Sequence, residues 1–566
     1  MDFLSYDIVI VGSGIAGLRA AIEATSTSNK LKIAVITKVQ AMRSHSVSAE
    51  GGTAAALYPE EGDSAESHVY DTIKGSDFLA DQDAVERLCS MMPAEIYQLE
   101  HWGMPWSRNK DGRIAQRHFG GYSFPRAVFA GDKVGFFEMQ TLYDTALKYD
   151  NIEFLQEWFV TSILKSDNKF QGLTAIEMKG GDFYAIKAKA GIIATGGPGR
   201  LYSFATYGHS STAEGLAMVY RAGIALKDME FVQFHPTGLC PSGILITEGA
   251  RGDGGVLVNK NGERFMARYA PEKKDLATRD VVSRAIMDEI NQGRGVESEG
   301  LEHVYIDLRH LGAEKIKERL STIREIAMKF NSIDPIEALI PVRPVCHYFM
   351  GGIDTNIDGA TKLSGLWAAG ECACISVNGA NRMGANSTAE CLVWVKITGA
   401  GAAKYAITKS AGTSKEAVEQ EQKRIYDEIF HGKGGENPYE IKKEMQRIMD
   451  RHIYVYRNGE GLLQALKLIR GLKKRAYRHA DDKSREYNTN FTNVLELDAN
   501  LEVSEAIVAG ALARTESRGA HARIDYPKRD DKKWLKHTLA YYSPDGTQLD
   551  YSAVIMTKYK PVERKY

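Results

Sequence analysis

One stretch near the N-terminus restricts the fold of this chain more than any other: YDIVIVGSGIAGLRAAIEA, residues 6–24. Its apolar run at residues 8–11 is typical of a parallel strand buried on both faces. Gly12, Gly14 and Gly17 follow at G-x-G-x-x-G spacing and lead into a helical pattern. These glycines permit a tight turn, close approach to a pyrophosphate and close helix–strand packing. The stretch predicts a dinucleotide site at a helix N-terminus, with a purely structural glycine turn as the alternative.

The end of the second predicted strand, residues 31–37, bears on which dinucleotide binds. An ordinary NAD site has an acidic residue there for the adenosine ribose. This chain has Thr37 and Lys38 instead, which weakens the NAD interpretation. A second strand-and-glycine segment, AGIIATGGPGR at residues 190–200, repeats the pattern and would return the chain to the cofactor. The sequence therefore favours FAD over NAD.

Composition restricts the classes of partner. The 72 Lys and Arg against 73 Asp and Glu give no strong overall field, so nucleic acid is not expected as a partner. No apolar run approaches the ~20 residues that span a bilayer, and no signal peptide is visible. The six cysteines are scattered without a C-x-x-C pair. That usage indicates a reducing compartment and predicts neither a metal site nor an iron–sulfur cluster held by this chain alone.

The 566 residues are too many for one core, and the pattern predicts an α/β fold in four units. We expect a FAD-binding domain of the two-dinucleotide type with an inserted α+β capping domain, a helical domain and a small C-terminal unit. The expected bounds are 1–236 with 346–412 for the FAD-binding domain, 237–345 for the capping domain, 413–525 for the helical domain and 526–566 for the C-terminal unit.

Residues 64–105 are expected to be helical, a strand is expected at 183–187, and helices are expected at 278–292 and 312–330 in the capping domain. Further local signals support the other units. Thr413 and Glu416 predict a capping box at a helix start. Pro438, which follows Asn437, is predicted to be the first residue of another helix. A turn at residues 544–546 predicts a C-terminal hairpin. Asn386 or Ser387 is expected to cap the helix that follows the last glycine-rich loop.

Eight short runs carry a family resemblance in this order: MRSHSVSAEGG, FVQFHPTG, TEGARGDGG, ATRDVVSRA, CHYFMGG, GECACISVNGANRMGANS, ESRGAH and KHTLAYY. Together they resemble the flavoprotein subunit of succinate dehydrogenase and fumarate reductase over essentially the whole chain. The resemblance implies FAD attached covalently to His45 through the flavin 8α-methyl group, a linkage that raises the flavin potential. It also implies contacts to FAD from Gly12, Ser13, Gly14, Ile15, Ala16, Gly17, Thr37, Lys38, Ser44, Ser46, Glu50, Gly51, Gly52, Ala194, Thr195, Gly196, Glu214, Glu371, Arg382 and Ser387.

A C4 dicarboxylate needs cationic or hydrogen-bonding groups at both ends. The resemblance assigns substrate binding to His235, Thr247, His347 and Arg382. For both histidines the alternative is a hydrogen-bonded core histidine. Each lies beside a proline or glycine turn, which favours a site residue.

The resemblance assigns proton transfer to Arg279, with a relay through Glu248 and Arg251. A guanidinium is ordinarily a poor proton donor. We expect the crowding of Arg279 with Arg251 and Arg382 in one dry site to make it a better one. The alternative for Arg279 is a salt bridge at a helix start, to Asp280 or a neighbour.

The sequence predicts an FAD-dependent succinate dehydrogenase subunit that oxidises succinate to fumarate, with the reverse direction open. Glu50 is the variant associated more with fumarate reductases, because dehydrogenases often have Gln there. A free L-aspartate oxidase is disfavoured by His45, and a nonenzymatic nucleotide-binding protein would leave the substrate residues unexplained. The resemblance further implies an iron–sulfur subunit and membrane anchor subunits that lead to quinone. This chain would then be peripheral on the cytoplasmic face of the membrane.

Overall fold

The computed structural model describes residues 3–298, 300–412, 415–433, 436–475 and 479–565. Its central sheet grows from the N-terminal stretch, where strand β1 (Phe3–Val11) leads through the glycine turn into helix α1 (Ile15–Thr27). β1 lies between β2 (Ile33–Thr37) and β9 (Asp182–Ile193) and runs parallel to both. Ile8, Val9 and Ile10 are fully buried, as a strand covered on both faces requires.

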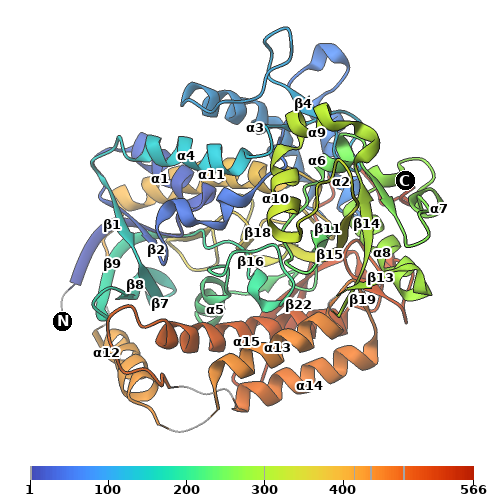
Figure 1. Ribbon diagram of the computed structural model, residues 1–566. Helices are drawn as coiled ribbons and strands as arrows, with labels where there is room; N and C mark the ends of the chain where they lie inside the picture. Colours follow the sequence, from blue (N-terminus) through green and yellow to red (C-terminus); the bar gives the residue numbers. More distant parts are fainter. Residues whose placement is uncertain (1–2, 299, 413–414, 434–435, 476–478, 566) are drawn as a thin grey trace.

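Seven strands form this sheet in the order β6-β2-β1-β9-β8-β7, and β17 also pairs with β9. The added strands are β6 (Ile152–Gln156), β7 (Trp158–Ser166), β8 (Lys169–Glu177) and β17 (Leu366–Ala368). Helices α1, α4 (Val134–Ala146) and α11 (Asn386–Thr408) lie side by side next to it (Figure 1). A Cβ on Gly17 would lie 1.8 Å from the carbonyl oxygen of Gly12, so only glycine lets α1 pack this closely on the turn.

Three sequence predictions differ from the structure in detail. The strands expected at 183–187 and from 190 are one continuous strand, β9. The helical region at 64–105 is divided into α2 (Ala65–Gly75) and α3 (Gln82–His101), because Asp77 and Phe78 adopt left-handed conformations between them. The helix expected at 312–330 is likewise two helices, α9 (Ala313–Arg319) and α10 (Ser321–Asn331).

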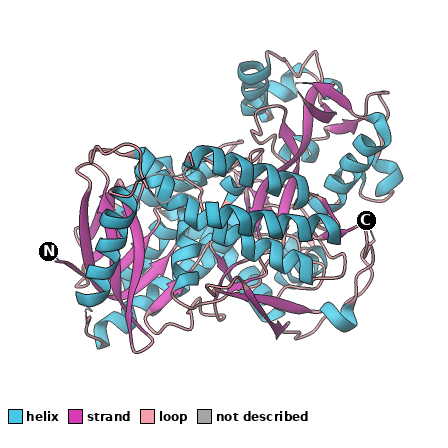
Figure 2. Ribbon diagram, turned by 90° about the horizontal axis from the view of Figure 1, so that it is seen from below, coloured by secondary structure: helices cyan, strands magenta, loops and turns pink. Residues whose placement is uncertain are grey.

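A second apolar core, formed by residues between Leu239 and Val342, belongs to a smaller lobe. Figure 2 shows this lobe at the upper right, apart from the long helices nearest the viewer. Strands β11 (Val232–Leu239) and β15 (Ile340–Phe349) are paired where the chain enters and leaves it. The lobe also contains α6 (Gly249–Gly252), β12 (Val256–Val258), α7 (Met266–Tyr269), α8 (Arg279–Glu289), β13 (Val296–Ser298) and β14 (Leu301–Asp307).

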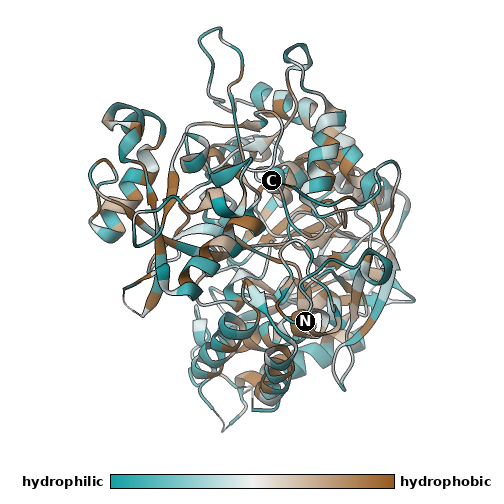
Figure 3. Ribbon diagram, turned by 90° about the vertical axis from the view of Figure 1, so that its right-hand side faces the viewer, coloured by the Kyte–Doolittle hydropathy of each residue, from teal (hydrophilic) through white to brown (hydrophobic). Residues whose placement is uncertain are grey.

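A layer of helices, α13 (Pro438–His452), α14 (Gly459–Arg475) and α15 (Thr489–Ala513), covers the underside of the molecule (Figure 1). Pro438 is the first residue of α13, as predicted, and Asn437 caps the helix, because its side chain accepts a hydrogen bond from the backbone N–H of Tyr439 at 2.9 Å. Figure 3 shows hydrophilic and hydrophobic stretches alternating along the helices at the bottom of the view. The capping box expected at Thr413 lies outside the described residues.

The predicted C-terminal hairpin is present as β21 (Lys536–Tyr541) and β22 (Gln548–Ala553). It extends a second sheet in the order β18-β16-β10-β21-β22. In the described part of the chain, no helix is both long and apolar enough to cross a bilayer. The remaining described strands and helices are β3 (Thr53–Ala54), β4 (Gln116–Arg117), β5 (Ala127–Val128), α5 (Glu214–Arg221), β10 (Leu226–Lys227), β16 (Gly352–Asp354), β18 (Ala373–Cys374), α12 (Lys415–Lys423), β19 (Tyr456–Arg457), β20 (Ala522–Arg523) and α16 (Asp531–Trp534).

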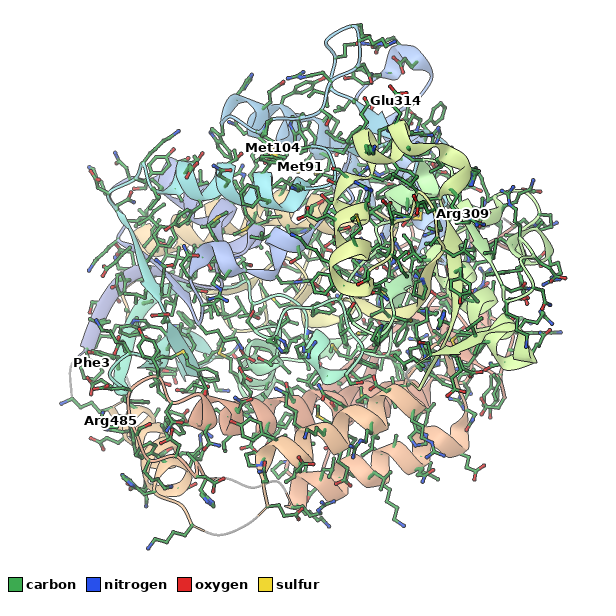
Figure 4. All side chains as sticks on the ribbon, in the orientation of Figure 1. Phe3, Met91, Met104, Arg309, Glu314 and Arg485 are labelled. Atoms are coloured by element: carbon green, nitrogen blue, oxygen red, sulfur yellow. The ribbon has the colours of Figure 1, made fainter. Side chains whose placement is uncertain are left out.

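The side chains in Figure 4 show how these parts are spaced. Arg309 and Glu314 mark the smaller lobe, while Phe3 and Arg485 lie at the opposite lower corner of the view. The predicted α/β fold class is confirmed. The four domain boundaries stay predictions.

Candidate active site

A cavity of about 590 Å³ runs from the β1–α1 turn to the smaller lobe. Ligand sites of small molecules and cofactors have volumes in this range. Three predicted residues do not line it: Gly17 packs inside the turn, and Glu248 and Arg251 lie behind the wall. The predicted residues that line it are Gly12, Ser13, Gly14, Ile15, Ala16, Thr37, Lys38, Ser44, His45, Ser46, Glu50, Gly51, Gly52, Ala194, Thr195, Gly196, Glu214, His235, Thr247, Arg279, His347, Glu371, Arg382 and Ser387.

The cavity end at the β1–α1 turn fits a diphosphate. Gly14 is the N-cap of α1 and has no side chain to satisfy the first N–H groups of the helix. A Cβ on Gly14 would lie 2.9 Å from Ser46 Oγ, so a larger residue would fill the space in front of the helix. Gly12 has φ +110° and sits against the carbonyl of Ala194, where a side chain would clash. The residues present therefore fit the pyrophosphate of FAD.

Lys38 follows the end of β2, where an ordinary NAD site has an acidic residue, and it binds carboxylates from two other elements. Its Nζ contacts Glu214 of α5 and lies 2.9 Å from Glu496 Oε1 of α15. Burial alone would lower the pKa of Lys38, but Glu214 and Glu496 raise it above its ordinary value. A carboxylate is thus supplied beside the expected ribose position from α5 rather than from β2.

His45 lies in the cavity wall, with its ring stacked on Tyr207 at a centroid distance of 4.9 Å. The backbone N–H of Gly208 donates to His45 Nδ1 at 3.3 Å. Enclosure by the protein lowers the pKa of His45 to about 4, so the ring is neutral at pH 7. The Tyr207 hydroxyl donates to Glu371, whose pKa is raised to about 7 by burial. The ring is therefore held in one orientation, and because Nδ1 accepts a hydrogen bond, the proton of the neutral ring lies on Nε2.

His235 and His347 meet edge to face at the other end of the cavity, with ring centroids 4.9 Å apart. The backbone N–H of Thr237 donates to His235 Nδ1 at 3.2 Å, while Thr206 Oγ1 lies 2.9 Å from His347 Nδ1. His235 Nε2 is buried and has no hydrogen-bond partner among the described residues. Burial and then Arg279 hold the pKa of both rings well below the ordinary value, so both are neutral. Neutral rings can donate to a carboxylate without adding charge.

Arg279 is the first residue of α8 and reaches the cavity from the smaller lobe. Its Nε lies 2.8 Å from Glu248 Oε2, and Arg251 Nη2 lies 4.0 Å from the same oxygen. Burial would raise the pKa of Glu248, but Arg279 and Arg251 hold it below the ordinary value. These three side chains form a continuous chain that leads inward from the cavity.

The alternative of a helix-start salt bridge from Arg279 to Asp280 is wrong. Asp280 pairs instead with Arg284 at 3.0 Å and with Arg564 at 2.7 Å. Because Asp280 has these partners, Arg279 is left to face Glu248 and the cavity.

Helix α11 points its N-terminus at the cavity, through Ala385, Ser387 and Thr388. The expected Asn386 or Ser387 cap is wrong: Ala385 is the N-cap, with φ +67°, and makes no side-chain cap bond. The Asn386 side chain is instead engaged by the Tyr122 hydroxyl at 2.9 Å. The helix N-terminus thus keeps its positive end available to an anionic group in the cavity.

Four residues at the site were missed by sequence reasoning. Gln233 accepts from Arg279 Nη1 at 3.1 Å, and Tyr348 lies under the Arg382 guanidinium. Both stand inside runs that carried the family resemblance, so their neighbours His235 and His347 could have drawn attention to them. Tyr207 and Glu496 belong to no such run and had no sequence signal.

Comparisons with known proteins agree with this geometry. The family model described as "FAD binding domain" matches residues 7–388, and "Fumarate reductase flavoprotein C-term" matches residues 442–566. The chain is 46% identical to the fumarate reductase flavoprotein subunit of Mycobacterium tuberculosis, over 99% of each chain. It is 42% identical to the succinate dehydrogenase flavoprotein subunit of Rickettsia bellii, over 98% of this chain and 96% of the relative. A solved quinol-fumarate reductase with menaquinol molecules superposes with a TM-score of 0.95 at 42% identity, over 99% of this chain and 100% of that chain.

Proposed function

Because this chain belongs to the flavoprotein subunit family of fumarate reductase and succinate dehydrogenase, we propose that it interconverts fumarate and succinate, with fumarate reduction as its main direction. The observation that carries the proposal is the convergence of His235, His347 and Arg382 with Arg279 on one cavity. Cationic and neutral donors at that end suit a dianionic C4 substrate.

Each group has a distinct role in this proposal. His235, Thr247, His347 and Arg382 bind the two carboxylates and fix the substrate against the cofactor. FAD, when bound, supplies or accepts a hydride. Arg279 delivers a proton to the substrate carbon in fumarate reduction and removes it in succinate oxidation. Glu248 and Arg251 return the proton through contacts of 2.8 and 4.0 Å. Proton donation by a guanidinium requires this dry, crowded setting.

Glu50 supports fumarate reduction as the main direction. It lines the cavity, and its Oε2 has no hydrogen-bond partner among the described residues. Burial and the nearby Asp132 raise its pKa well above the ordinary value, with Arg117 opposing them. The raised pKa favours the protonated form of the Glu50 carboxyl group, which can release a proton, whereas an amide at this position cannot.

The direction can be tested by protein-film voltammetry of the purified chain with both substrates. The catalytic current for fumarate reduction should exceed that for succinate oxidation. Glu50→Gln should shift the ratio of the two currents toward succinate oxidation by about threefold to tenfold, because the exchangeable proton is lost. A wild-type protein with the larger current for succinate oxidation would reverse the assigned direction.

We further propose that His45 carries FAD covalently and that electrons arrive through a separate iron–sulfur subunit and membrane anchor subunits. The neutral, oriented His45 ring supports the covalent bond. The similarity to a quinol-fumarate reductase with menaquinol molecules supports a complex that uses a quinol. In such a complex this chain would be peripheral on the cytoplasmic face. The isolated chain should exchange electrons with small artificial dyes but hardly with a hydrophobic quinol, and equal rates would contradict the need for partners.

A further inference from the structure

Arg382 is held differently from the other arginines at the substrate end of the cavity. Arg279 and Arg251 both approach the Glu248 carboxylate, at 2.8 and 4.0 Å. Arg382 is only 3% exposed, yet it has no ion pair within 4.0 Å among the described residues. Its Nη1 donates to the carbonyl of Met383 at 3.3 Å, and its Nε has no described partner.

The guanidinium of Arg382 instead lies over the ring of Tyr348, with Cζ 4.2 Å from the ring centroid. This distance is well within the ~6 Å over which the negative face of an aromatic ring attracts a cation. Tyr348 is also only 3% exposed. The interaction is strongest when water is excluded, and both partners meet that condition here.

The position of the Tyr348 ring is fixed from two sides. Its hydroxyl donates to Glu390 Oε2 at 3.0 Å, and Asn378 Nδ2 donates to the same oxygen at 2.7 Å. On the neighbouring strand, Gln233 lies directly opposite Tyr348 and donates to the carbonyl of Arg382 at 2.7 Å. Two opposed residues of β11 and β15 thus hold the backbone and the guanidinium of Arg382.

We propose that Tyr348 is the positioning residue for Arg382, and that its ring face replaces the carboxylate that would ordinarily hold a buried arginine. A carboxylate partner would neutralise the charge before substrate arrives. An aromatic face orients the guanidinium without carrying a formal charge, so the cation stays available for a substrate carboxylate.

Glu390, which orients the ring, fits this arrangement. Burial raises its pKa to about 8, so it is mostly protonated at pH 7 and contributes little negative charge. The alternative is a purely structural role for Tyr348, since it packs in an apolar cluster with Leu79, Phe231 and Met350. The two interpretations differ in one respect: only the positioning role depends on the electrons of the ring.

The test measures fumarate binding to the oxidised, FAD-loaded protein by calorimetry, where no turnover occurs. Phenylalanine and its mono-, di- and trifluorinated forms are placed at position 348. These rings keep nearly one shape while the negative face weakens with each fluorine. Tyr348→Phe should bind within about threefold of wild type, and the dissociation constant should then rise stepwise to about tenfold for the trifluorinated ring. Tyr348→Leu should weaken binding by at least as much.

The matched control is Phe231→Leu. Phe231 is a buried ring of the same cluster and also lies under an arginine, Arg514 at 4.9 Å, but it does not line the cavity. The Phe231→Leu substitution should lower the melting temperature of the protein without changing its affinity for fumarate. A dissociation constant that stays flat across the fluorinated series would overturn the positioning role, even if Tyr348→Leu fails to fold.

The inference rests on the proposed function, but different experimental results would contradict each of them. A wild-type protein that neither binds nor reduces fumarate would remove the proposed function. A wild-type protein that does both, with a flat fluorinated series, would remove only the role of Tyr348.

Discussion

At the substrate end of the cavity, the histidines and the arginines differ in charge. His235 and His347 are neutral because burial and Arg279 hold their pKa values well below normal. Burial and then Arg279 also lower the pKa of Arg382, to about 10, which still leaves it cationic at pH 7. The positive charge that a dicarboxylate meets therefore comes from the arginines, and the histidines contribute directional donors.

Arg279 should be essential in both directions. Arg279→Ala should lower turnover by at least about a thousandfold while the FAD content stays normal, because the proposed proton donor is lost. Arg279→Lys keeps the charge but cannot reproduce the separate contacts to Glu248 and Gln233, and it should stay below about 1% of wild type. Steady-state rates with both substrates measure this. Arg284→Lys, five residues further along α8, is the control and should stay within about twofold. Near wild-type rates with Lys would show a role that is only electrostatic.

His45 should separate cofactor attachment from cofactor binding. His45→Ser should keep FAD bound but release it on denaturation, since the noncovalent contacts remain. Loss of the proposed linkage would lower the flavin potential, and the equilibrium constant for hydride transfer from succinate to the flavin falls about tenfold for each ~30 mV of a two-electron couple. Succinate oxidation should therefore fall further than fumarate reduction. Intact mass and acid precipitation report attachment. A wild-type chain from its native host without a flavin adduct would contradict the covalent bond.

At the scale of elements, helix ends and strand pairs place the reacting groups. The N-termini of α1 and α11 both open on the cavity, one at the expected diphosphate and one beside Ser387. The β11–β15 pair carries His235 and Gln233 on one strand and His347 and Tyr348 on the other. The substrate end is therefore built on paired strands, which hold side chains more rigidly than loops do.

Strand β21 is fastened by a buried ion network that gives a pH-dependent stability. His537 contacts Asp228 Oδ2 at 2.6 Å and Asp81 Oδ1 at 3.1 Å. Burial alone would lower the pKa of His537, but Asp228 and Asp81 raise it from 6.5 to about 9. A raised pKa means that the stabilisation is fully present below pH 6.5 and is lost as the pH rises through 9.

His537→Gln should therefore destabilise the protein most at low pH. The difference in unfolding free energy from wild type should shrink between pH 6.5 and 9, by at most about 1.4 kcal/mol per pH unit for one proton. Denaturant unfolding at several pH values measures this. His303→Gln is the control, because burial lowers the pKa of His303. A difference that stays constant with pH would show that His537 is not charged in the folded protein.

At the scale of the whole molecule, the helical layer reaches back to the cofactor end of the cavity. Glu496 of α15 lies 2.9 Å from Lys38 and 3.8 Å from Lys442 of α13. Residues 458 positions apart therefore meet beside the expected ribose. The layer supports the cofactor site as well as covering the molecule.

Glu496→Gln should weaken FAD binding without touching the substrate end. Lys38 keeps Glu214, so the expected loss is about 1 kcal/mol, or roughly fivefold in affinity. The measurement uses the His45→Ser background, where dissociation of FAD can be followed by flavin fluorescence. Glu502→Gln on the same helix, which pairs with Arg221 at 2.8 Å, is the matched control. Equal effects of the two variants would assign the loss to general destabilisation of α15.

The sequence by itself determined the cofactor turn and the α/β class, and all but three of the site residues it predicted line the cavity. These signals are local: β-branched runs, glycine spacing and short motifs are properties of neighbouring residues. Helix boundaries were less certain, since Asp77 and Phe78 adopt left-handed conformations, which are uncommon for residues other than glycine.

Only the tertiary structure decided which charges face one another. In the folded protein, Asp280 pairs with Arg284 and Arg564, and Lys38 pairs with Glu214 and Glu496. The Arg382 guanidinium lies over the ring of Tyr348. These partners lie on different elements, and burial strengthens or removes their charges according to what surrounds them. The sequence alone does not show which elements pack against one another. The contacts of Tyr348 and Glu496 could therefore be identified only from the folded protein.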